Sequence, residues 1–80
     1  MNVRKVFGQI KELHRLAQKE TDSASKTILE RAENLLWDSY NKHRISLIDK
    51  NLEGTALTSI ETKDLKQLQK LAGMVRELCS

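Results

Sequence analysis

The sequence predicts an all-α fold made of three antiparallel amphipathic helices, of which the second is long and central. Apolar residues recur at steps of three and four over three segments, which is typical of helices with one buried face. The chain has no proline, and polar clusters separate the segments. Hydrophobic residues make up 39% and charged residues 31%, as in an ordinary helix-rich soluble domain. We therefore expect residues 1–80 to form a single domain, a helical bundle.

The first helix is predicted over residues 2–19. Seven residues form its apolar side: Val3, Val6, Phe7, Ile10, Leu13, Leu16 and Ala17. The segment that follows supplies Asp22 and Ser23, whose side chains can accept hydrogen bonds from the free N–H groups at a helix start. A tight turn there predicts that the first two helices are antiparallel.

The second helix is predicted to begin near Ala24 and to meet no strong breaker before Gly54. A glycine there can adopt the left-handed backbone conformation that ends helices. The third helix is predicted from Ser59 to Cys79, because Thr58 and Glu61 have the spacing of a capping box.

The apolar residues of the second helix change sides along its length. On a helical wheel, one stripe contains Ile28, Ala32, Leu35, Leu36, Tyr40 and His43. A second stripe, on the opposite side, contains Trp37, Ile45, Ile48 and Leu52. We expect the first helix to cover the first stripe and the third helix to cover the second, in a splayed, Z-like arrangement.

Two alternatives follow from the same pattern. A break within residues 39–43 would divide the long helix and give a conventional bundle of four helices. If the helix stays straight, its exposed stripes favour coverage by a second copy, which gives an antiparallel homodimer. A domain of 80 residues buries only about 60–65% of its unfolded surface, so added burial would stabilise it. We therefore expect a homodimer.

The sequence contains no motif for catalysis. No serine, cysteine or threonine stands in a nucleophile motif, and no glycine-rich loop could hold phosphate. His14 and His43 have no second ligand at metal-binding spacing, so no metal site and no cofactor are predicted. We expect His43 to be a partly buried, hydrogen-bonded residue. These observations argue against an enzyme.

The leading functional prediction is a small regulatory protein that binds and modulates a larger protein through an exposed helical face. Four residues are candidates for the interface: Trp37, Ile45, Ile48 and Leu52. Tryptophan is enriched among the residues that dominate binding energy. For Trp37, a position under the third helix is the alternative.

The second functional prediction is a regulator that binds nucleic acid. Arg4, Lys11 and Arg15 lie on one side of the first helix, where a row of cations could follow a phosphate backbone. A simpler interpretation is a solvated face partly neutralised by acidic residues of the neighbouring helix. The three carboxylates expected to do so are Glu30, Glu33 and Asp38.

No apolar run approaches the roughly 18 residues that cross a bilayer, and no secretory signal opens the chain, so a cytoplasmic location is expected. In size and helix order, the chain resembles cytoplasmic helical-bundle immunity proteins that protect against bacteriocins. The segment "ILERAENLL" and the C-terminal helix carry this resemblance. It implies a helical bundle that binds a protein toxin.

Overall fold

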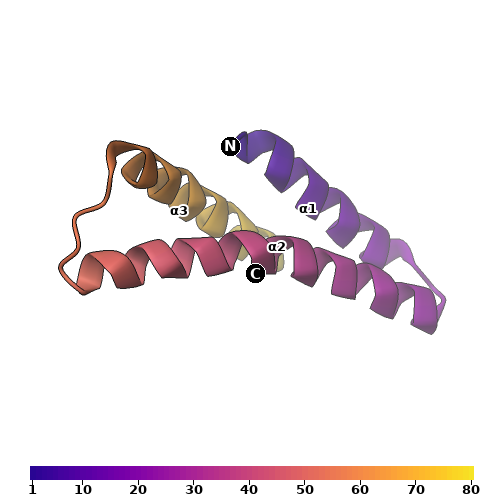
Figure 1. Ribbon diagram of the computed structural model, residues 1–80. Helices are drawn as coiled ribbons and strands as arrows, with labels where there is room; N and C mark the ends of the chain where they lie inside the picture. Colours follow the sequence, from indigo (N-terminus) through magenta and orange to yellow (C-terminus); the bar gives the residue numbers. More distant parts are fainter.

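The computed structural model describes residues 1–80 and contains three α-helices and no strand (Figure 1). Helix α1 spans Val3–Lys19, α2 spans Ser23–Leu52 and α3 spans Ser59–Cys79. The predicted number, order and bounds of the helices are therefore confirmed. Helix α2 continues through residues 39–43 without a break, so the four-helix alternative is not adopted.

Each helix begins at a polar residue whose side chain accepts a backbone hydrogen bond. Asn2 accepts from the Lys5 N–H at 3.1 Å, and Asp22 accepts from the Ser25 N–H at 2.9 Å. Thr58 caps α3 in the predicted capping box, in which its hydroxyl and the Glu61 carboxylate each accept a backbone N–H at 3.1 Å. These bonds satisfy N–H groups that have no partner inside the helix, which fixes where each helix starts.

Helix α2 ends at Leu52, and Gly54 stops it two residues later, as predicted. This glycine has a φ of 84°, in the left-handed region that is costly for residues with a Cβ atom. Its N–H donates to the Asn51 carbonyl at 3.1 Å, and the Thr55 N–H donates to the Lys50 carbonyl at 3.2 Å. This pair of bonds is the Schellman motif, which turns the chain toward α3.

The hydrophobic core lies where the three helices meet near the middle of α2. Four buried residues form it: Val6 and Ile10 of α1, and Leu71 and Val75 of α3. Leu36, Trp37 and Tyr40 of α2 pack against this core cluster. Figure 1 shows α1 and α3 on the same side of α2, both diverging from it, which leaves a molecule of 48 × 21 × 20 Å.

The predicted coverage of two stripes on opposite sides of α2 holds only in part: Leu36 and Tyr40 of the first stripe and Trp37 of the second pack against the core cluster, but the ends of both stripes are exposed. Ile28 and Leu35 of the first stripe are 67% and 66% exposed, and Ile45 and Leu52 of the second are 44% and 77% exposed. Leu47, which was assigned to neither stripe, is the one buried residue of α2, at 3% exposed. The reason is that α1 and α3 approach α2 from the same side, so α2 needs a single inward face along its whole length.

Candidate protein-interaction surface

The side of α2 that faces away from α1 and α3 carries exposed apolar residues. Ile28 and Leu35 lie seven residues apart in the first half, and Ile45 and Leu52 lie seven apart in the second. All four are at least 44% exposed. Seven residues are close to two turns of an α-helix, so the members of each pair lie within about 20° of each other around the helix axis. Exposed apolar groups in such a row are typical of a surface that contacts another protein.

Charged residues occupy the positions between these apolar residues. They are Arg31, Asp38, Lys42 and Asp49. The Asp38 and Lys42 side chains form an ion pair with an Oδ2 to Nζ distance of 3.1 Å, and both remain at least half exposed. We call the four charged residues together with the four apolar ones the outer seam. Along it, successive residues are alternately three and four positions apart, the a and d spacing of a coiled coil.

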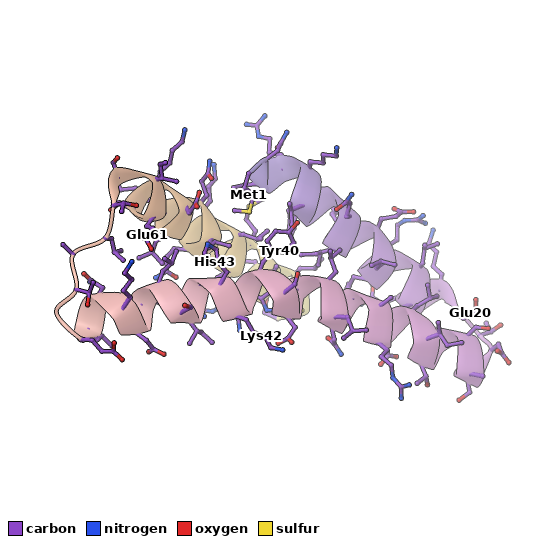
Figure 2. The ribbon with its side chains drawn as sticks, in the orientation of Figure 1. Met1, Glu20, Tyr40, Lys42, His43 and Glu61 are labelled. Atoms are coloured by element: carbon purple, nitrogen blue, oxygen red, sulfur yellow. The ribbon has the colours of Figure 1, made fainter.

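The opposite side of α2 faces the other two helices. Tyr40 packs against the core cluster, Leu47 is 3% exposed, and the Glu33 side chain is 12% exposed. These three residues are also seven positions apart. Figure 2 shows the contrast directly: Lys42 points away from α1 and α3, whereas Tyr40 and His43 point toward the space between them. Helix α2 therefore has an inward face, which packs against α1 and α3, and an exposed face on the opposite side, which carries the outer seam.

The four residues predicted to form an interface are divided between these faces. Trp37 is half-buried and packs against the core cluster, and Ile48 is also half-buried. Ile45 and Leu52 lie on the outer seam. Sequence reasoning missed the seam because a wheel at 100° per residue rotates Ile28 well away from Leu52 over 24 residues. A repeat of 3.5 residues per turn, which describes a helix that winds around a partner, is the count that places both residues on one side.

On the basic face of α1, Arg4 and Lys11 are exposed, but Arg15 has a partner within its own helix. The Arg15 Nε donates to Glu12 at 3.0 Å, and a second hydrogen bond joins the same two groups. This hydrogen bonding lowers the pKa of the Glu12 carboxyl. Two of the three predicted cations are therefore free of ion pairs.

No ion pair joins this row to the acidic residues of α2 that were expected to neutralise part of its charge. Glu33 bonds to His14, and Asp38 pairs with Lys42 of its own helix. Glu30 makes no ion pair. The reason is geometric: the basic row faces outward from α1, whereas Glu33 lies on the inward face of α2.

A polar cluster joins α1 to α2 near the end of α3. The amide of Gln18 donates to His14 Nε2 at 3.0 Å, so His14 donates from Nδ1 to Glu33 at 2.8 Å. Ligand atoms of His14, Glu33 and Cys79 lie within 4.8 Å of one another, and these donor types can bind zinc. In the structure, the Nδ1 hydrogen bond to Glu33 makes this cluster a contact between α1 and α2. Spacing rules missed it because its members come from three helices.

An open groove of about 550 Å³ lies between the start of α1, the middle of α2 and the first half of α3. Tyr40, His43, Asp64 and Leu68 contribute to its lining, and Met1 lies at its edge (Figure 2). His43 is exposed and forms no side-chain hydrogen bond to another residue, which corrects the expectation of a partly buried, hydrogen-bonded histidine. The divergence of α1 from α3 opens this groove and leaves the ring accessible.

None of the three helices combines the length and hydropathy that crossing a membrane requires. Comparisons with protein families, curated proteins and solved structures found no match to this chain.

Proposed function

We propose that this chain is a small non-enzymatic interaction protein that binds and modulates a protein partner by pairing the outer seam of α2 with a helix of that partner. The observation that carries the proposal is the exposure of four large apolar side chains along one unbroken helix: Ile28, Leu35, Ile45 and Leu52 are 44% to 77% exposed, at positions that share the a and d spacing of a coiled coil. In helical pairs, side chains at this spacing insert between side chains of the facing helix.

The total exposed surface supports the same proposal. A compact monomer of 9.2 kDa exposes about 4,900 Å². This chain exposes 5745 Å². The excess of roughly 800 Å² equals the area that one partner typically contributes to a stable protein interface. The splayed packing of α1 and α3 accounts for this extra surface, part of which a partner could cover.

Site-specific photocrosslinking in the cells that produce the protein tests this function. A photoreactive amino acid replaces Leu35 on the outer seam or, as a control, exposed Glu77 on α3. We expect protein adducts from position 35 and none above background from position 77. Adding Asp38→Lys, which changes the charge of the seam without removing the label, is expected to abolish the adducts. Equal labelling from the two positions would overturn the proposal.

A further inference from the structure

The two halves of the outer seam have opposite patterns. In the first half, the apolar residues Ile28 and Leu35 occupy the a position of the seven-residue repeat. In the second half, the apolar residues Ile45 and Leu52 occupy the d position. When two copies lie parallel, each residue faces its own equivalent, so the apolar residues match but each charged residue meets a like charge. The outer seam can match itself in both respects when one copy is reversed.

We propose that the partner is a second copy of this chain, with the two α2 helices antiparallel and a two-fold axis level with Tyr40. This inference rests on the proposed function and names its partner. A two-fold axis at that level brings each residue opposite the one that lies equally far on the other side of Tyr40. The contacts of the dimer can therefore be read from the sequence.

The apolar residues then face one another. Ile28 and Leu52 are each twelve residues from Tyr40, so Ile28 meets the partner's Leu52. Leu35 and Ile45 are each five residues away, so Leu35 meets the partner's Ile45. The two-fold axis repeats both contacts, which gives four apolar layers. These layers bury the side chains that are 44% to 77% exposed in the single chain.

The charged residues face one another with opposite signs. Asp38 and Lys42 are each two residues from Tyr40, so Asp38 meets the partner's Lys42. Because Asp38 and Lys42 already form a pair of 3.1 Å within one chain, the centre of the dimer holds a network of four alternating charges. Arg31 and Asp49 are each nine residues away and meet in the same manner. In every layer of the seam, an apolar residue thus faces an apolar residue, or a charged residue faces a residue of opposite charge.

Charge selects this orientation over the parallel one. In a parallel pair, Asp38 would face the partner's Asp38, and Lys42 would face the partner's Lys42. Like charges held opposite each other oppose association and thereby set the orientation of paired helices. Sliding the antiparallel pair by one repeat would place Leu35 against the partner's Asp38 in one direction and Asp38 against the partner's Asp49 in the other, so the register is fixed as well. This self-complementarity favours a second copy over an unrelated helix.

The rest of the molecule leaves room for the second copy. In Figures 1 and 2, α1 and the first half of α3 lie above α2 whereas Lys42 points below it, and the four apolar residues of the seam are 44% to 77% exposed. The residues flanking the central layers, Ser39 and Ser46, are small and exposed, which permits close approach of the two helices. Two α1–α3 pairs would then cover the outer sides of a central pair of α2 helices.

The first test uses charge reversal and solution mass by sedimentation equilibrium. We expect the wild-type chain to have twice the mass of 9.2 kDa. Asp38→Lys and Lys42→Asp place like charges in the central layers, and each is expected to weaken dimerisation roughly tenfold or more. Mixing the two variants in equal amounts restores opposite charges and is expected to restore the dimer. The matched controls Glu77→Lys and Lys63→Asp change exposed charges on α3 and should have no effect.

The second test determines orientation with a short bifunctional thiol reagent in a Cys79→Ser background. Leu35→Cys and Ile45→Cys are expected to crosslink when the two variants are mixed and not within either variant alone. Residue 35 and its equivalent in the partner are ten residues apart along the seam, about 15 Å, in the proposed register. Crosslinking of Leu35→Cys to itself would show a parallel pair and overturn the proposed orientation.

The outcomes separate this inference from the proposed function. A wild-type monomer at all concentrations overturns the second copy as the partner. If position 35 still forms adducts with another protein in cells, the proposed function stands with a different helix in the seam. A monomer without adducts overturns both. Mixing the two charge variants also distinguishes lost pairing from misfolding. Two misfolded chains would not form a dimer when they are mixed.

Discussion

Gly73 lies inside α3 on an exposed side, where a Cβ atom would meet no other atom within 4 Å. Alanine is favoured over glycine in a helix interior by about 1 kcal/mol, chiefly because glycine loses more backbone entropy. We therefore expect Gly73→Ala to raise the free energy of unfolding by about 1 kcal/mol in urea denaturation at fixed protein concentration. A lower stability would indicate that another chain approaches this position closely.

Glu61 gives the chain a pH-dependent contribution to stability. Its carboxylate accepts hydrogen bonds from Lys50 Nζ at 3.0 and 2.9 Å and from the Thr58 N–H, and these bonds lower its pKa below the ordinary 4.5. The folded state favours the charged carboxylate, so the contribution is present above about pH 4.5 and is lost as the pH falls through the lower folded pKa.

We therefore expect Glu61→Gln to lower the free energy of unfolding at pH 7 and to have a smaller effect at pH 3. Urea denaturation at the two pH values measures the difference. Glu77→Gln, at an exposed carboxylate without an ion pair, is the control and should behave alike at both. The same loss at pH 7 and at pH 3 would contradict a role for the charge.

Among the contacts between single residues, those that the sequence predicts join residues close together in the chain. Thr58 and Glu61 could be identified as a capping box because they are three residues apart and cap the same helix. His14 and Glu33 could not be paired from the sequence, because they are 19 residues apart and meet only when α1 packs on α2. Cys79 is even farther along the chain, so its position beside His14 and Glu33 could not be predicted either.

The two faces of α2 differ sharply in what a leucine contributes to folding. Leu47 is 3% exposed and Leu52 is 77% exposed. In the Asp38→Lys background, which keeps the seam unpaired, Leu47→Ala is expected to lower the free energy of unfolding by about 2–4 kcal/mol through lost burial and a cavity. Leu52→Ala is expected to change it by about 0.5 kcal/mol or less. Equal losses in urea denaturation would contradict the inward assignment of Leu47.

Helix bounds and helix faces were not equally predictable. The bounds follow from local signals, because Asp22, Thr58 and Gly54 stop or start a helix through bonds to their immediate neighbours. The faces depend on where other helices approach, and α1 and α3 share one side of α2. An apolar stripe therefore indicates that a helix face is buried against another element, but not whether that element belongs to the same chain.

For the whole molecule, the proposed dimer links stability to concentration. A dimer unfolds into two chains, so mass action raises its unfolding temperature as protein concentration increases. We expect the midpoint of thermal unfolding to rise by several degrees over about a hundredfold range of concentration. Leu35→Asp, which places a charge opposite the partner's Ile45, is expected to remove this dependence. Identical midpoints for the wild-type chain across the range would contradict an obligate pair.

The continuity of α2 between its two faces has a consequence for how the chain can change over time. Inserting or deleting one residue in the middle of a helix rotates everything beyond that point by about 100°. Such a change between residues 41 and 46 would carry Leu47 out of the core and turn Leu52 out of line with Ile28 in the same step. Substitutions on the sides between the faces disturb neither. Insertions and deletions within α2 should therefore be tolerated far less than substitutions at the positions between its two faces.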